Sequence, residues 1–481
     1  MTEGTDGYVE NIANGSDREG YTTLQGGANL QWAVSDRLGV QVNVAAEEND
    51  DGDWTRVVKD RDAYNAVWNT GIGEYDVSED YAGFAENDSD RESLKISYRF
   101  PWANLVSVTS RLARTDDMGG DLDCTTMDYM NFNQSYEREQ YSQEIRLVSP
   151  HGKEAWSWIL GGFYSTMDYE TEQLFHFGND YPLPFDQTSL VEKEDDTYAV
   201  FGQSTVRLLD ERLGMTAGLR YEHAERSIER TRYYTMNGVD YALDDPALGY
   251  LASKFSGKYD LDDDFDSLLP KFTLDYRFTP DVMIYATAAL GYKAGGFSFI
   301  VNDPTLAGYD SEYAWTYEAG LKSRLWGDRL MVNLSGFYTD VEDYQDRIVI
   351  DNVVTMKNAA KAKIYGAEAE LHARPLSGLD FTASLGLQNA EYDDYTDTQK
   401  GQTVCYDGNF IALVPDFQYN VAAQYRFPWG ICLRGEIFGV GKFYFNRENI
   451  DRMSQEGYEI VNAKIGYEIE RFDVYVYGNN L

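Results

Sequence analysis

The stretch LDFTASLGLQ, residues 379–388, alternates apolar and polar side chains with a period of two. Successive side chains of a β-strand point to opposite faces of a sheet, so this pattern predicts a strand with one apolar and one polar face. The same alternation appears in residues 213–222 and in residues 461–468. We therefore expect an all-β protein in which amphipathic strands recur along the chain.

The composition favours strands joined by tight turns over helices. The 481 residues include 15% aromatic residues, 42 Gly and only 11 Pro. No run approaches the roughly 20 apolar residues that a spanning helix needs, and the mean hydropathy is -0.50. These features exclude a helical membrane protein. They still allow a membrane barrel, because each of its strands needs only about 9 to 11 residues and turns only every second one to lipid.

Connection lengths separate a barrel from a soluble β-sandwich. Very short turns are expected at residues 35–37, 101–104, 210–212, 279–281, 326–329, 375–378 and 428–430. They alternate with long polar segments at residues 48–90, 115–137, 169–196, 230–265, 294–312, 343–360, 393–414 and 444–456, which we expect to be loops. Short turns at one rim and long loops at the other are typical of outer-membrane barrels. Tryptophans near expected strand ends fit the aromatic girdles of such barrels, namely Trp32, Trp102, Trp156, Trp158, Trp315, Trp326 and Trp429.

The charge excludes some partners. With 81 acidic and 41 basic residues, a net charge of -40 argues against nucleic-acid binding, which needs a basic surface. The acidic segments are interpreted as solvated loops, with attraction of cationic ligands left open. The alternately spaced Asp260, Asp262, Asp264 and Asp266 could present carboxylates to calcium or to calcium-bridged lipopolysaccharide, but they lack the full EF-hand pattern. We predict no metal site.

Cysteine and histidine spacing indicates no metal centre and no redox centre. Cys124, Cys405 and Cys432 lack a paired CxxC motif, and a bridge between Cys124 and Cys405 stays open. The four histidines lie far apart in the sequence: His151, His176, His223 and His372. No nucleophile elbow, phosphate loop or histidine-containing metal cluster is recognisable. We therefore predict neither enzyme activity nor a cofactor.

Five stretches together resemble the barrel of TonB-dependent receptors, the outer-membrane siderophore-receptor-like β-barrels. They are residues 195–223, 268–298, 317–345, 364–371 and 461–481. The resemblance implies an antiparallel up-and-down transmembrane β-barrel, with about 18 strands present of an expected 22. Residues 1–481 would form a partial barrel domain without a plug domain or the terminal strands, and residues 6–11 would end the third barrel strand.

The resemblance also implies a function and a location. We expect a receptor or transporter in the bacterial cell outer membrane, for TonB-dependent uptake of an iron-siderophore complex or a similar bulky nutrient. Its partners would be outer-membrane lipid and lipopolysaccharide, the ferric siderophore or other nutrient, and the TonB complex only if a plug is supplied. The alternatives are a passive outer-membrane porin and a non-transport surface β-protein, such as an adhesin or binding module.

Candidate site residues come from two places. Aromatic residues expected at the extracellular rim could contact a bulky, partly apolar ligand: Tyr292, Phe297, Phe299 and Tyr309. The neighbouring Gly295 and Gly296 are expected to serve a backbone bend. Three polar residues alternate with Ala367, Ala369 and Leu371 and should face the lumen: Glu368, Glu370 and His372.

Overall fold

The computed structural model describes residues 2–5, 7, 9–18, 20–52, 65, 71–73, 75–150, 155–242, 245, 257–350, 353–399 and 402–481. His151, which the sequence places in a short turn, lies outside these residues. The long strands are β4 (Tyr21–Ala33), β5 (Leu38–Asp50), β7 (Phe84–Arg99), β8 (Asn104–Asp121), β9 (Met130–Val148), β10 (Trp156–Phe177), β11 (Phe185–Leu208), β12 (Leu213–Met236), β14 (Lys258–Thr279), β15 (Val282–Lys293), β18 (Glu312–Leu325), β19 (Leu330–Ile350), β20 (Val353–Ala373), β21 (Leu379–Gln399), β23 (Phe417–Arg426), β24 (Ile431–Val440), β27 (Tyr458–Ile469) and β28 (Phe472–Gly478).

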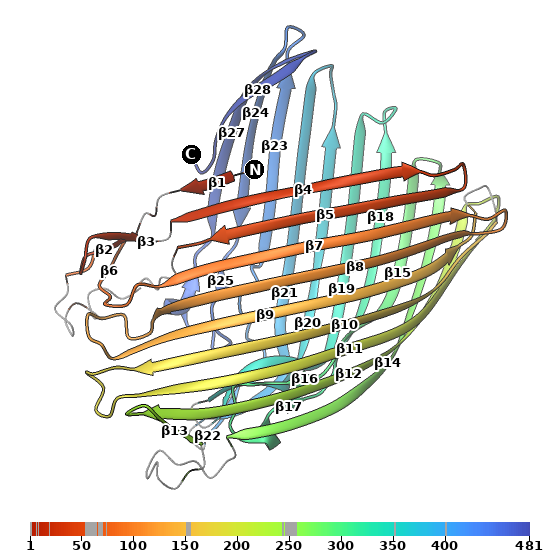
Figure 1. The fold of residues 1–481 in the computed structure, drawn as a ribbon. Coiled ribbons are helices and arrows are strands. Elements are labelled where there is room, and N and C mark those ends of the chain that lie inside the picture. Colours follow the sequence, from red (N-terminus) through yellow and green to blue (C-terminus); the bar gives the residue numbers. More distant parts are fainter. Residues whose placement is uncertain are drawn as a thin grey trace.

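These strands form one antiparallel meander that curves into a barrel wall (Figure 1). From β4 onward, each long strand pairs with the next long strand along the chain. The sheet has 21 strands, and setting aside the short β1 (Thr2–Thr5), β13 (Val239–Ala242) and β22 (Gln402–Cys405) leaves eighteen. The expected all-β, up-and-down architecture with about 18 strands is confirmed.

The short turns fall where the sequence predicts them. For example, β18 ends at Leu325 and β19 begins at Leu330. The turn between them passes through positive φ at Trp326, Gly327 and Asp328, which reverses the chain within a few residues. A glycine is needed in the turn before β21, because Gly378 has a φ of +85° and an added Cβ would lie 2.3 Å from the carbonyl oxygen of Arg426.

The prediction that the long polar segments are loops is wrong for much of their length. Most of residues 169–196 belong to β10 and β11, which pair without interruption as far as Phe177 and Phe185. These strands have 22 and 24 residues, about twice what a membrane crossing requires. The hydrogen-bonded ladder continues beyond the apolar zone because backbone pairing does not need apolar side chains. Many of the acidic residues therefore lie on strands that project past the membrane.

The expected end of a barrel strand at residues 6–11 is wrong for residues 9–11, and residues 6 and 8 lie outside the described residues. β1 precedes this segment and pairs with β4. Val9–Asn11 instead form β2, which joins β3 (Ser16–Arg18) and β6 (Asp76–Val77) in a separate small sheet. Val9 and Val77 of this sheet are buried, and the buried Asn11 side chain donates to the carbonyl oxygen of Glu79 at 2.9 Å.

The two faces of the wall differ as the alternation predicts. Leu385 is 40% exposed on the outer, apolar face. The opposite face carries pairs of hydroxyl groups, such as Thr205 with Thr216 at 2.8 Å and Thr273 with Thr287 at 3.0 Å. We call this second face the inner face. Five of the tryptophans are exposed near the short turns: Trp32, Trp102, Trp156, Trp326 and Trp429.

In the described part of the chain, no helix has the length and apolar character needed to cross a membrane.

Candidate functional site

The connection between β15 and β18 folds against the inner face at the end of the long hairpins (Figure 1). We call residues 294–311 the inner strap. It contains β16 (Gly296–Phe297), η2 (Pro304–Leu306) and β17 (Gly308–Tyr309), and β16 pairs with β17. At Gly295 an added Cβ would lie 2.3 Å from the Phe265 ring, so close packing requires glycine there.

Apolar contacts along the inner strap and hydrogen bonds at both of its ends hold it to the wall. Val301 and Ala307 of the strap are buried against Val191, Ile228 and Tyr259 of the wall. At the ends of the strap, Gln345 Nε2 donates to the carbonyl oxygens of Ala294 and Asp310 at 2.9 and 3.0 Å. The strap is therefore a packed part of the interior and not a projecting loop.

Three cationic side chains of the wall bind the inner strap. Arg230 donates to the Val301 carbonyl oxygen and to Asn302 Oδ1, both at 2.8 Å. Arg232 donates to the same Asn302 oxygen at 2.7 Å. Lys193 donates to the Phe297 carbonyl oxygen at 2.9 Å. The wall thus supplies the donors in these contacts and the strap supplies the acceptors.

Burial disfavours the charged forms of these side chains. Burial, together with the neighbouring charge of Arg230, lowers the pKa of Arg232 to about 9. Burial also lowers the pKa of Lys193, and the nearby Asp195 opposes this shift. Asp195 lies 3.5 Å from Arg226 Nε, and burial raises the pKa of its carboxyl group. The strap therefore covers a group of cationic side chains that are largely withdrawn from solvent.

The four aromatic residues predicted to contact a ligand lie in or next to the inner strap. Phe297 and Phe299 pack against the apolar cluster of the wall, and Lys193 Nζ lies 5.4 Å from the centre of the Phe299 ring. The Tyr292 ring lies 5.5 Å from that of Tyr313, and Tyr309 is half-buried in β17. Phe297 and Phe299 are thus packed inward against the wall, and the role of the four aromatic residues as ligand contacts stays a prediction.

The three residues predicted to face the lumen lie on the face opposite Leu385. Ser335 donates to Glu368 at 3.4 Å and Asn333 donates to Glu370 at 3.1 Å, whereas His372 lies 3.1 Å from Asp380. A cavity of about 300 Å³ beside Glu368 is lined by further polar side chains, including Ser384, Gln388, Gln418 and Asn420. Side chains of the neighbouring strands β19 and β21 therefore already bind the polar groups of Glu368, Glu370 and His372.

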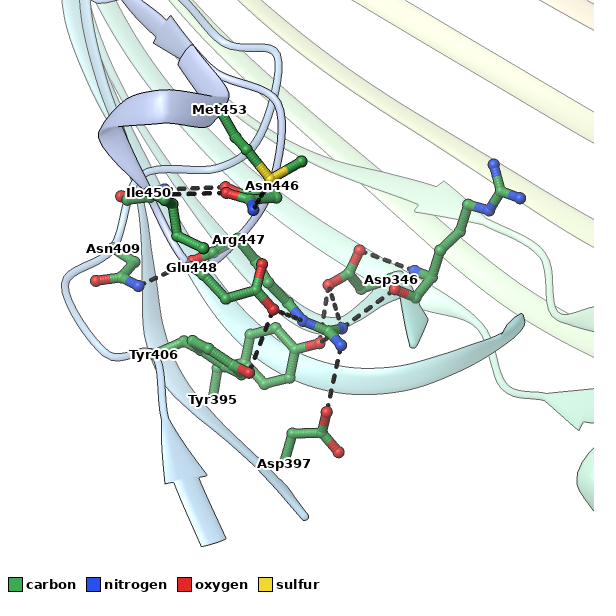
Figure 2. Close-up of polar contacts among 12 residues, drawn as sticks. Asp346, Tyr395, Asp397, Tyr406, Asn409, Asn446, Arg447, Glu448, Ile450 and Met453 are labelled. Carbon is green, nitrogen blue, oxygen red and sulfur yellow. Dashed lines mark hydrogen bonds and ion pairs between the residues drawn. The ribbon is translucent and has the colours of Figure 1, made fainter. Parts of the chain in front are cut away.

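A second polar centre joins three extracellular connections around Arg447 (Figure 2). Arg447 is 9% exposed, and its guanidinium lies 3.4 Å from Asp346, 3.3 Å from Asp397 and 3.6 Å from Glu448. It also donates to the hydroxyl of Tyr395. No sequence motif marks this arginine, because its partners come from distant hairpins.

The family model described as the β-barrel of TonB-dependent receptor-like proteins matches residues 4–481. The chain belongs to the TonB-dependent receptor family. Solved structures support the fold. The ferric yersiniabactin uptake receptor FyuA from Yersinia pestis is 20% identical, with a TM-score of 0.78 over the whole of this chain and 69% of that one. The siderophore receptor PiuA from Acinetobacter baumannii is 12% identical, with a TM-score of 0.74 over the whole of this chain and 72% of that one. The copper transporter OprC is 11% identical, with a TM-score of 0.68 over the whole of this chain and 70% of that one.

Membership of the TonB-dependent receptor family confirms several predictions. The chain is a barrel of the Gram-negative outer membrane, and its family consists of transporters and not enzymes. It resembles receptors for siderophore and metal uptake, and the porin and adhesin alternatives are not favoured.

In this receptor, the tertiary structure also brings together a group of potential metal ligands that the sequence did not indicate. His223, Asp264 and Asp266 each offer a ligand atom within 4.8 Å of the others, on paired strands β12 and β14. The sequence suggested no histidine-containing cluster, because His223 is more than 40 positions from Asp264. The four alternating aspartates from Asp260 to Asp266 were expected in a loop and instead lie on β14.

The other described histidines also contact aspartates. His176 lies 2.6 Å from Asp186 and 3.6 Å from Asp128. Cys405 carries a free thiol, so the bridge to Cys124 that the sequence left open is not formed.

Proposed function

We propose that this receptor barrel serves the TonB-dependent uptake of an iron-siderophore complex or a similarly bulky nutrient. The observation that carries the proposal is the match of the TonB-dependent receptor β-barrel over residues 4–481. The relatives named for siderophore uptake support the substrate class, and the wide polar inner face is compatible with a bulky ligand.

The aromatic residues of the inner strap are the proposed ligand contacts. Phe297, Phe299 and Tyr309 lie in the inner strap and Tyr292 lies on β15 just before it, at the extracellular end of the barrel, where a ligand from outside the cell would arrive first. Aromatic rings offer large apolar contact areas at a low entropic cost. Engagement of the TonB complex would require a plug domain, and outer-membrane lipid and lipopolysaccharide are the proposed surroundings of the outer face.

Transport assays under iron limitation test this proposal. Cells lacking the gene should lose uptake of one ⁵⁵Fe-siderophore complex out of a chemically diverse panel, and inactivation of TonB should cause the same loss. Uptake that persists without TonB and scales linearly with substrate concentration would support passive diffusion instead. A Phe297→Ala, Phe299→Ala double variant should weaken ligand binding, whereas the outward-facing Phe472→Ala should not.

A further inference from the structure

Two arginines of the wall, Arg230 and Arg232, are buried under the inner strap, and Lys193 is half-buried there. We call Lys193, Arg230 and Arg232 the cationic recess. Arg230 is 0% exposed, and within the described part of the chain none of the three forms an ion pair with an acidic side chain. Buried charges in proteins are normally paired, because leaving the solvent costs several kcal/mol per ion, on the order of what a strong pair recovers.

The inner strap satisfies the recess with neutral oxygen atoms only. Its acceptors are two backbone carbonyl groups and the Asn302 side chain, whose single oxygen is shared by Arg230 and Arg232. Arg230 Nε is buried and has no hydrogen-bond partner among the described residues. The planar fork of a guanidinium matches the paired oxygens of a carboxylate or phosphate. The neutral acceptors therefore occupy the positions that an anion would fill more favourably.

The cationic recess is positively charged, whereas the chain as a whole is strongly acidic. The protein carries a net charge of -40, yet three cationic side chains, Lys193, Arg230 and Arg232, contact this one strap, and Asp195 pairs with Arg226 and offsets the charge of Lys193. Such a cluster attracts anions and repels cations at short range, where burial weakens solvent screening.

We propose that the cationic recess is a binding site for an anionic group, a carboxylate or phosphate carried by a ligand, and that the inner strap is the cover which this group displaces. The identity of the natural ligand rests on the proposed function. In the closed state, burial of Val301 and Ala307 holds the strap in place. Displacement would move Phe297 and Phe299 with the strap and would place them beside the apolar part of the same ligand.

Hydrogen–deuterium exchange of the refolded barrel tests the site with inorganic phosphate as the probe. In the wild-type protein, phosphate should speed exchange of the strap amides, such as Ser298 N–H, which is bonded to the Ala307 carbonyl oxygen at 2.8 Å. Chloride at the same ionic strength should not. Asn302→Ala removes the shared acceptor and should raise strap exchange by about tenfold or more while keeping the phosphate effect.

A carboxylate introduced into the cationic recess should have the opposite effect on strap exchange. Asn302→Asp should slow strap exchange and abolish the response to phosphate, because the new charge already pairs with both guanidinium groups. Gly308→Asp is the matched control: it adds the same charge to an exposed part of the strap, where a Cβ meets only Phe297 at 3.8 to 4.0 Å. This control should keep the phosphate response.

Two results would overturn the proposal: equal strap exchange in phosphate and chloride for both wild type and Asn302→Ala, or an Asn302→Asp protein that still responds to phosphate. Either would make the arginines structural anchors of the strap. The assay measures binding to the barrel without transport, so failed uptake with intact phosphate binding would contradict only the proposed function.

Discussion

Arg447 reaches Asp346 across 101 positions of the chain, with Nη1 3.4 Å from Oδ2. This contact joins the connection after β24 to the β19–β20 hairpin, and Asp397 adds the β21–β22 hairpin to the same guanidinium (Figure 2). The extracellular ends of these strands are therefore held together by one buried cation. A buried apolar cluster that includes Ile348, Tyr395 and Tyr406 packs the same hairpins against one another.

Replacement of this cation should loosen the extracellular hairpins and leave the membrane wall intact. Arg447→Met leaves Asp346 and Asp397 without their shared cation, at a cost of about 3 to 5 kcal/mol of local stability. Limited proteolysis should then cut the β19–β20 and β21–β22 hairpins faster. Arg324→Met is the control, because Arg324 is 58% exposed beside Asp281 and should contribute at most about 1 kcal/mol. Equal protease sensitivity of the two variants would refute the role of Arg447.

The end of β8 should become less stable as the pH rises. Burial and the nearby charge of Asp123 raise the pKa of the buried Asp121 to about 7. A carboxyl group with a raised pKa in the folded state stabilises the fold fully below its unfolded pKa of about 4, and this contribution is lost as pH rises toward 7. Exchange protection of residues 122–130, corrected for intrinsic rates, should therefore fall by about tenfold or more between pH 4.5 and 7.5.

Asp121→Asn separates this effect from general charge repulsion. The amide keeps an oxygen to accept the Cys124 N–H, which lies 2.6 Å from Asp121 Oδ1, but it does not titrate. In the Asp121→Asn variant, exchange protection of residues 122–130 should be nearly independent of pH over the same range. The Asp260→Asn variant, changed at an exposed position, should behave like wild type. A pH response that survives in Asp121→Asn would assign the effect to another group.

Arginine scanning of β21 should distinguish the two faces of the wall. Leu385→Arg places a charge on the outer face and should cost about 2 to 4 kcal/mol in a bilayer. At Gly386 an added Cβ meets nothing within 4 Å, and the paired residue on β20 is Glu368, so Gly386→Arg should cost less. Reversible unfolding in liposomes measures both. Equal costs would contradict the assignment of the faces.

A single methyl group at Gly295 should displace the inner strap. Gly295→Ala brings a Cβ within 2.3 Å of the Phe265 ring and 2.4 Å of the Tyr309 carbonyl oxygen, and such overpacking costs about 1 to 3 kcal/mol. Amide exchange in residues 296–309 should rise. Gly291→Ala, whose Cβ would make ordinary contacts at 3.5 Å, should leave the strap protected. A protected strap in Gly295→Ala would show that the neighbours of Gly295 yield easily.

The sequence by itself determined the amphipathic strands, the short turns and the polarity of the two faces. These features depend on neighbouring residues, since the two-residue period of residues 379–388 states directly which side chains share a face. The sequence did not indicate that Phe297 and Phe299 pack inward against the wall, and their role as ligand contacts stays a prediction.

Only the tertiary structure decided how far the strands extend, where the inner strap lies and which charges meet. β10 and β11 continue through acidic sequence because their backbones remain paired, and side-chain polarity does not report that pairing. Arg230 contacts Asn302, 72 positions away, and Arg447 contacts Asp346 at a still greater separation. Contacts at such separations depend on the curvature and register of the whole sheet, which local periodicity does not encode.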